Sequence, residues 1–131
     1  ILDMSTDGFN YTQLNAVCDS YPHLKVILSR VYWTTIRDLL PLMQKHKNLC
    51  LETSLFQLNQ GFNVISAKCG PERLVFGTNL PDSEPGAAIA MVTLADISEE
   101  QKNLIASGNI RRLLGLDAVA EEAVEVAPDS A

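Results

Sequence analysis

The sequence lacks any long hydrophobic run and any leader-like start. No apolar stretch approaches the roughly 20 residues that span a bilayer. The opening residues 1–4 show neither the basic nor the apolar segment of a signal peptide. We therefore expect a cytoplasmic protein without a membrane partner. Because the first residue is Ile and not Met, we also expect a piece of a longer polypeptide.

Cysteine is scarce, and several catalytic motifs are missing. Cys18, Cys50 and Cys69 are odd in number and tens of residues apart, which fits neither a disulfide framework nor a zinc knuckle. We expect them to be buried small hydrophobic side chains. The sequence has no Gly-rich phosphate loop, no Gly-x-Ser-x-Gly elbow and no Cys-x-x-Cys pair, so these patterns indicate no function.

Basic residues are missing from residues 117–131, which contain five carboxylates. These five account for all but one unit of the net charge of −6, so residues 1–116 are close to neutral. A nearly neutral body offers no basic surface for phosphates, and we expect no nucleic-acid partner. We divide the chain into a folded part, 1–116, and a flexible acidic tail, 117–131.

The rest of the composition is typical of one folded domain. Hydrophobic residues make up 47% of the 131 residues and charged residues 20%. Three β-rich runs, 24–29, 48–53 and 73–78, recur at a spacing of about 24 residues, which leaves room for one crossover helix between neighbours. The pattern predicts an α/β fold with a parallel sheet. Residues 1–3 fit the end of a further strand.

Helix signals fill the intervals between these runs. Thr34 or Thr35 is placed to cap one helix, and Ser98 opens a capping box for another. Gly115 follows Arg111 and Arg112, as at a helix end. The predicted helices cover 10–19, 34–43, 59–68, 84–95, the segment after Ser98, and 109–114.

In parallel α/β folds, functional side chains lie at the carboxyl ends of the strands. Here these are Asp3, Arg30, Glu52, Thr78 and Asn79. We expect Arg30 to bind a substrate carboxylate, with Thr78 and Asp3 also contacting substrate. Glu52 is a candidate acid or base, and Asn79 a candidate hydrogen-bond donor to a substrate carbonyl or hydroxyl.

A structural interpretation of the same residues stays open. Arg30 could brace a loop with Glu52 as its ion-pair partner, and Asn79 could be a turn residue before Pro81. His23 and His46 fall at the opposite end of the sheet, and we assign neither to a metal.

Residues 70–81, with Glu72-Arg73 at the start of the strand and Phe76-Gly77-Thr78-Asn79 at its end, resemble a known strand. They are similar to the last barrel strand of the amidohydrolase-related family of metal-dependent hydrolases, Gly-x-Glu-Arg-(apolar)₂-Phe-Gly-Thr-Asp-x-Pro. Residues 21–29 resemble that family's aromatic-Pro-x-Leu-Lys strand entry, and residues 108–116 its closing helix. The resemblance implies parallel βα units from the C-terminal half of a TIM (β/α)₈-type barrel. A complete barrel needs about 250 residues.

The family also implies a divalent metal, such as zinc, that activates water. Where the family has a strand-end Asp, this sequence has Asn79, and where it has a His, this sequence has Arg30. An amide is a poor ligand and a guanidinium repels a metal, so we expect degenerate metal-ligand positions and no cofactor evident in this chain.

The resemblance predicts an amidohydrolase-related hydrolase acting on a small, anionic ester, amide or lactone. The alternative is a catalytically inactive, barrel-derived protein that binds a metabolite or a partner. An open flavodoxin-like sheet unrelated to the barrel is a third interpretation. For a barrel, we expect the missing N-terminal half, or a second copy of the chain, as a partner.

Overall fold

A four-stranded parallel sheet lies at the centre of the chain in a computed structural model that describes residues 1–5 and 10–116. Its strands, in spatial and sequence order, are β1 (Leu2–Asp3), β2 (Val26–Ser29), β3 (Leu49–Glu52) and β4 (Leu74–Val75). In register, Leu28 is opposite both Leu2 and Leu51, and Leu51 is opposite Leu74. The predicted parallel α/β fold is confirmed.

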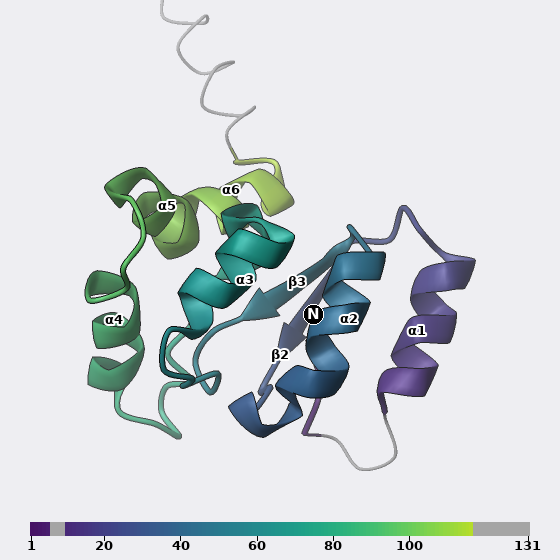
Figure 1. The fold of residues 1–131 in the computed structure, drawn as a ribbon, viewed down its shortest axis with the longest axis horizontal. Helices are drawn as coiled ribbons and strands as arrows, with labels where there is room; N and C mark the ends of the chain where they lie inside the picture. The colour runs from purple at the N-terminus through teal and green to yellow at the C-terminus, as the bar shows by residue number, and fades with distance from the viewer. Residues whose placement is uncertain (6–9, 117–131) are drawn as a thin grey trace, which may run out of the picture.

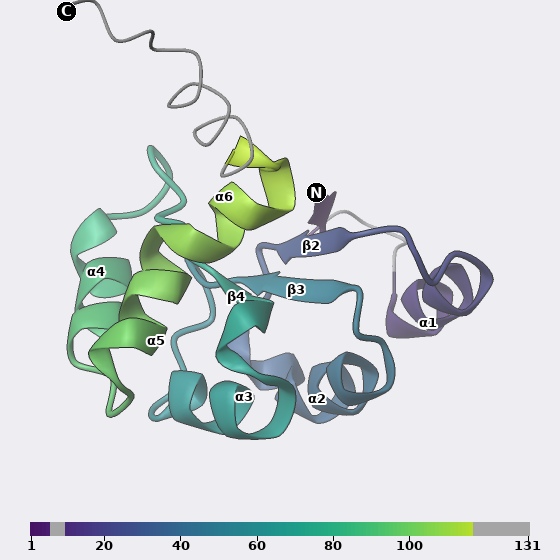
Figure 2. The same cartoon turned by 90° about the horizontal axis from the view of Figure 1, so that it is seen from above.

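Each of the first three strands is followed by a helix on the same face of the sheet (Figures 1 and 2). These helices are α1 (Tyr11–Ser20), α2 (Ile36–Lys45) and α3 (Gly61–Cys69). Short 3₁₀ turns, η1 (Trp33–Thr35) and η2 (Pro71–Arg73), precede α2 and β4. Helices on one face of consecutive parallel strands form βα units, the repeating element of a (β/α) barrel.

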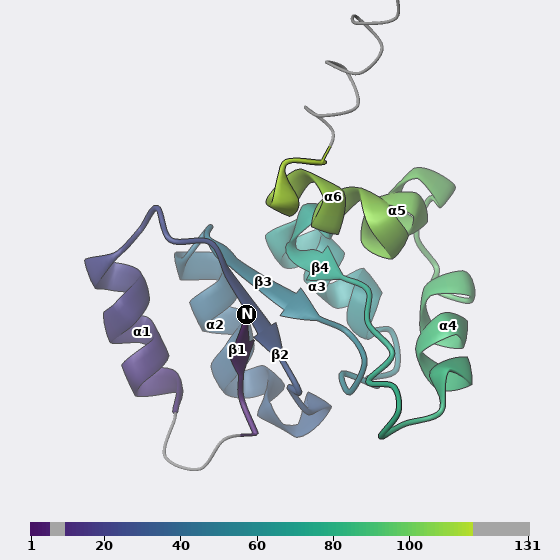
Figure 3. The same ribbon diagram turned by 180° about the vertical axis from the view of Figure 1, so that it is seen from behind.

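The core lies between the sheet and these helices. Alternate strand residues such as Leu49 and Leu51 are fully buried, as are helix residues Leu39, Phe62 and Ile65. The intervening residues belong to the opposite face of the sheet, which is turned toward the viewer in Figure 3. On this face Ile27, Ser29 and Glu52 are only partly buried, whereas Cys50 and Val75 are buried. The sheet therefore has one face covered by helices and one more open face.

Four helical segments follow β4 in the described part of the chain (Figure 2). They are α4 (Pro85–Thr93), α5 (Glu99–Asn103), the π-helical turn η3 (Leu104–Gly108) and α6 (Asn109–Leu114). Two of them, η3 and α6, pack against β4. The predicted strand 73–78 is too long: the amide of Phe76 donates to the carbonyl of Ile105 in η3, at 3.1 Å. Strand pairing ends where this contact begins, so β4 stops at Val75.

Two buried polar side chains connect the amino ends of the strands to the helices. The Arg73 guanidinium donates to the carbonyls of Leu49, His46 and Met43, and only 3% of the residue is exposed. Asn109 in α6 donates to the carbonyls of Pro71 and Leu74, both at 2.8 Å.

Most helix-end predictions are confirmed. Ser98 forms the capping box of α5 with Gln101, and Gly115 ends α6 with φ +70°. The expected Thr cap of α2 is wrong. Thr35 precedes α2, but its hydroxyl donates to the carbonyl of Tyr32 and accepts from the Tyr11 hydroxyl, so it does not cap.

The cysteine prediction also holds. Cys18, Cys50 and Cys69 are free and buried, and burial raises the pKa of each thiol. Within residues 1–5 and 10–116, no helix is long and apolar enough to cross a membrane. The predicted acidic tail, 117–131, lies outside the described residues.

Candidate functional site

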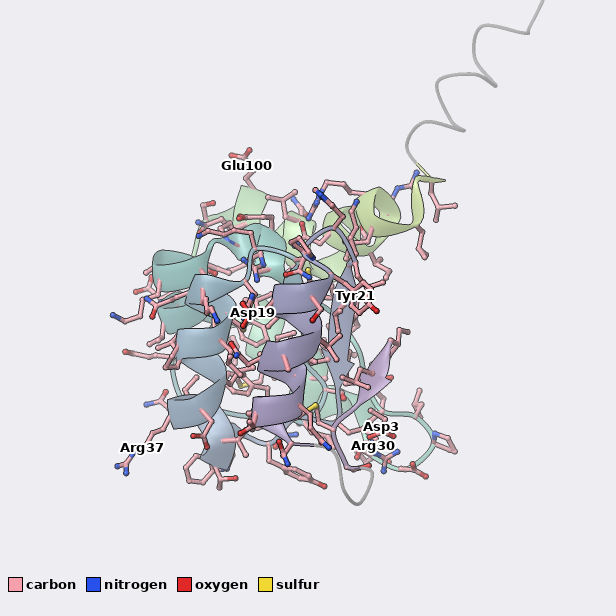
Figure 4. All side chains as sticks on the ribbon, turned by 90° about the vertical axis from the view of Figure 1, so that its right-hand side faces the viewer. Asp3, Asp19, Tyr21, Arg30, Arg37 and Glu100 are labelled. Atoms are coloured by element: carbon pink, nitrogen blue, oxygen red, sulfur yellow. The ribbon has the colours of Figure 1, made fainter. Side chains whose placement is uncertain are left out.

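The predicted site residues are positioned by the carboxyl ends of the four strands. Asp3 ends β1 and Glu52 ends β3, while Arg30 directly follows β2. Thr78 and Asn79 belong to the segment that leaves β4. Because the strands are parallel and in register, their ends lie along one edge of the sheet. Figure 4 shows Asp3 and Arg30 side by side, with Asp19 and Tyr21 toward the other end of the molecule.

Arg30 carries the positive charge of this edge. Its backbone is left-handed, with φ +56°, an uncommon conformation for a residue with a side chain. Nη1 lies 3.3 Å from Asp82 Oδ2, and Nε lies 4.0 Å from Asp3 Oδ2. Nε is buried but has no hydrogen-bond acceptor among the described residues. The guanidinium is therefore placed between two carboxylates with one donor unsatisfied.

Asp3 is held by the turn that follows β1. One carboxylate oxygen accepts from the Ser5 hydroxyl at 2.7 Å and from the Ser5 amide at 2.8 Å. These hydrogen bonds, the hydroxyl first, lower the pKa of the Asp3 carboxyl, and the charge of Arg30 lowers it further. Asp3 is therefore an anionic neighbour of Arg30.

Glu52 has a different partner from the one expected. Its two carboxylate oxygens accept from the Ser54 amide at 2.7 Å and from the Ser54 hydroxyl at 2.8 Å. The interpretation of Glu52 as the ion-pair partner of Arg30 is wrong, because Arg30 pairs with Asp3 and Asp82. Glu52 also packs tightly on Gly77, where an added Cβ would collide with its carboxylate.

Asn79 begins the turn after β4. Its φ of +57° is one that Asn tolerates better than most residues. Its side-chain amide donates to the Ser83 hydroxyl at 3.0 Å, and its carbonyl accepts from the Ser83 amide at 3.0 Å. The loop after Asn79 carries Asp82 to Arg30, and the Leu80–Pro81 peptide bond within it is cis. Asn79 is thus a turn residue, as the structural interpretation had it. Thr78 lies between Asn79 and Gly77, the residue on which Glu52 packs.

The sequence interpretation missed four partners in this edge. They are Ser5, Ser54, Asp82 and Ser83. Three follow their partner by two to four residues, a spacing typical of Asp, Asn and Ser side chains in turns. The spacing of Ser5, Ser54 and Ser83 from their partners could therefore have indicated these hydrogen bonds from the sequence. Asp82 is 52 positions from Arg30, and no local signal connects them.

Two cavities are present elsewhere on the surface. One, of about 420 Å³, lies between the start of α3 and α4 and is lined by Phe62 and Met91. The other, of about 360 Å³, lies at the amino ends of the strands, near Lys47 and Arg73. Neither is lined by a predicted site residue. In the described residues, the candidate site is therefore an open edge next to the more open sheet face.

Comparison with known proteins decides the family. A profile described as amidohydrolase matches residues 1–116. The chain belongs to the amidohydrolase family. The family inferred from the strand and helix motifs is thereby confirmed, and hydrolase-related function follows from it at that general level. Searches of curated proteins and of solved structures found no match.

Amidohydrolases typically use a divalent metal, and the described side chains at this edge do not form a ligand group for one. Within the described ranges, no three His, Cys, Asp or Glu side chains gather as a ligand group. The cation of Arg30 lies between Asp3 and Asp82, where it would repel a metal ion. His46 is near the amino ends of the strands, where it contacts Asn15. We therefore assign no chemical step to a metal bound by these side chains.

Proposed function

We propose that this amidohydrolase domain hydrolyses a small anionic ester, amide or lactone at the carboxyl edge of its sheet. The observation that carries the proposal is the buried Nε of Arg30, a cationic donor that meets no acceptor among the described residues. A buried donor left unpaired is costly, and a substrate carboxylate would supply the missing oxygen. Arg30 would then hold the anionic end of the substrate.

Neighbouring side chains support binding at this edge. Asn79 uses one amide N–H on Ser83, which leaves the other for a substrate carbonyl or hydroxyl. Thr78, beside it, carries a hydroxyl that can donate or accept. Asp3, held anionic by Ser5, would disfavour a second negative group in the substrate near Arg30. The arrangement favours a substrate with one negative end and a polar reacting end.

Hydrolysis also needs a group that takes a proton from water as the new C–O bond forms. Glu52 is the carboxylate at the end of the neighbouring strand and is our candidate. Its proton would go to the leaving oxygen or nitrogen as the original bond breaks. The hydrogen bonds from Ser54 would orient the carboxylate in this role.

A second function, binding without turnover, is favoured by the same contacts. Both Glu52 oxygens already accept hydrogen bonds from Ser54, which leaves fewer lone pairs to accept a proton from water. Asn79 provides a neutral amide where the family pattern has an acid. A domain that keeps Arg30 but lacks an effective base would bind an anionic metabolite without converting it.

The two functions are separated by turnover assays on a panel of anionic esters, amides and lactones, with and without chelator. For the hydrolase we expect turnover that persists in chelator. Since hydrogen bonds to a charged group contribute about 1.5–3 kcal/mol, Arg30→Ala should raise KM about 10- to 100-fold. Arg37, exposed on α2, gives the matched control Arg37→Ala, which should change neither kcat nor KM.

Elemental analysis of the same protein tests the metal assignment. Stoichiometric zinc or manganese, with activity lost in chelator, would contradict a metal-free mechanism and imply ligands beyond the described residues. No turnover, together with a ligand-induced rise in Tm that Arg30→Ala removes, would favour the binding function.

The proposal extends to barrel closure. The described sheet has four strands, whereas a (β/α)₈ barrel has eight that pair edge to edge. We infer that further strands, from a longer polypeptide or a second copy, cover the open face and pair with β1. Light scattering on this chain tests the second source: a dimer at micromolar concentration supports it, and a stable monomer rejects it.

A further inference from the structure

The second cavity, at the amino ends of the strands, is lined mainly by basic side chains. It has a volume of about 360 Å³ and lies between the turns that enter β2, β3 and β4 and helix α6. The charged and titratable residues that line it are His23, Lys25, Lys47, Glu72, Arg73 and Arg112. Four permanent cations thus surround one carboxylate. The carboxyl-end site around Arg30 is at the opposite end of the strands.

The cations that line the cavity outnumber the carboxylates described near them. In the described residues, the ion pairs within 4.0 Å involve Arg30, Lys45, His46 and Lys102, and none involves a cavity cation. The single carboxylate, of Glu72, lies against Gly70, where an added Cβ would collide with it. Among the described residues, the cavity lining therefore keeps an excess of positive charge, with four cations and one carboxylate.

Two of the cations are held in place by the fold. Arg73, 3% exposed, donates through Nε and Nη2 to backbone carbonyls of Leu49, Met43 and His46. Arg112 donates through Nη2 to the carbonyl of Glu72, at 3.0 Å. A buried charge is costly unless other groups compensate it. Here a fixed guanidinium in the cavity wall is combined with two lysines from separate turns.

We propose that this cavity binds a small oxyanion that carries two or more negative charges, such as a phosphate compound or a polycarboxylate. Lys25 and Lys47 supply point charges, and Arg112 presents a fork that suits phosphate and carboxylate oxygens alike. The volume is near the lower end of the range for small-molecule pockets, about 300–1,000 Å³, which fits a compact ligand. The site is separate from the proposed hydrolytic edge.

Isothermal titration calorimetry on the full chain tests the site, with pyrophosphate and citrate as separate probes at low salt. We expect saturable binding of at least one probe. The double variant Lys25→Gln/Lys47→Gln should weaken it by about tenfold or more, because two of the four charges are lost. Raising the salt should also weaken it. The tighter probe indicates whether phosphate or carboxylate is preferred.

Matched variants make the result specific. Arg37→Gln removes an exposed cation outside the cavity, and Arg30→Ala alters the hydrolytic edge; both should leave the affinity unchanged. The double variant should keep the wild-type Tm, since neither lysine makes a hydrogen bond or ion pair among the described residues. Absence of binding by both probes at about 10 mM, or equal affinity in the double variant, would overturn the proposal.

Discussion

Single residues play different structural roles at the two ends of the sheet. At the carboxyl end, Arg30 and Asn79 adopt left-handed backbone conformations that direct their side chains into turns. At the amino end, Arg73 and Asn109 donate to backbone carbonyls of the turns and strands around them. Strained backbone is often found at functional sites, while satisfied buried groups stabilise the fold. Substitutions at the two ends should therefore affect different measurements.

Gly77 is required by the position of Glu52. In Gly77→Ala, the new Cβ would lie 2.6 Å from the carboxyl carbon of Glu52, so the carboxylate must move away from Ser54. We expect a loss of about 1 kcal/mol in the free energy of unfolding, because the flexible carboxylate can move but then loses its hydrogen bonds from Ser54. Urea titration measures it.

Gly86 provides the matched control for Gly77. A Cβ there meets nothing within 4 Å, and the residue lies in α4, so Gly86→Ala should stabilise by about 0.5–1 kcal/mol. Equal effects of the two substitutions would show that the Glu52 contact is not what requires Gly77.

Arg73 tests the amino end. Arg73→Met keeps much of the side-chain volume but leaves the carbonyls of Leu49, His46 and Met43 without their donor. Hydrogen bonds to a charged group contribute about 1.5–3 kcal/mol, so we expect a loss of roughly 3 kcal/mol or more in unfolding free energy. Thermal and urea unfolding measure it, with the exposed Arg37→Met as control. A change below about 0.5 kcal/mol would contradict a bracing role.

Asp3 gives a prediction on pH dependence. Its pKa is lowered in the folded chain, so its contribution to stability is present above its ordinary pKa and is lost as the pH falls through the lowered value. Below about pH 4, stability should therefore decline less steeply in Asp3→Asn than in the parent chain.

The same residue can be followed directly by NMR titration of its carboxyl group. Ser5→Ala should raise the pKa of Asp3 toward its ordinary value, because the Ser5 hydroxyl is the largest cause of the shift. An Asp3 pKa at or above the ordinary value in the parent chain would contradict the observed turn.

At the scale of elements, the helices on the covered face were predictable and the end of the sheet was not. The run that contains Phe62, Ile65 and Cys69 gave α3 with the expected buried face. The last strand ended early because Phe76 turns to Ile105, a residue of a helix. The length of β4 is thus limited by a hydrogen bond from the backbone of the next residue, Phe76, to a carbonyl of η3 and not to a neighbouring strand.

Helix α5 gives the prediction at this scale. Ser98 accepts from the Gln101 amide, and Gln101 accepts in return from the Ser98 amide. Ser98→Ala removes one of these bonds and should lower the unfolding free energy by about 1 kcal/mol. Glu84, which precedes α4 without a capping bond, is the comparison: Glu84→Ala should stay within about 0.5 kcal/mol. A similar loss in both variants would argue against the capping box.

At the scale of the whole molecule, the family match and the near-neutral body end at the same place. The amidohydrolase match covers residues 1–116, and the remaining residues hold five carboxylates and no basic residue. The helices and strands that make up the core lie within the matched part. The matched part therefore contains the core that we associate with the family.

Truncation after Leu116 tests this division. Since the core of the described part is built from residues before position 117, we expect the unfolding free energy to stay within about 0.5 kcal/mol of the parent value at physiological salt. The isoelectric point should rise, because five negative charges are removed. Urea unfolding and isoelectric focusing measure the two effects. A loss of several kcal/mol would assign residues 117–131 to the fold.

The sequence alone was enough to predict the α/β class, the order of strands and helices, the family and the strand-end positions of Asp3, Arg30 and Glu52. These follow from periodic apolar runs, turn residues and a motif, all of which are local in the chain. The folded structure was needed to show that Arg30 pairs with Asp82, that Glu52 packs on Gly77, and that four cations line the amino-end cavity. These residues are 22 to 87 positions apart in the sequence, and their relative placement depends on the register of parallel strands, which no local pattern specifies.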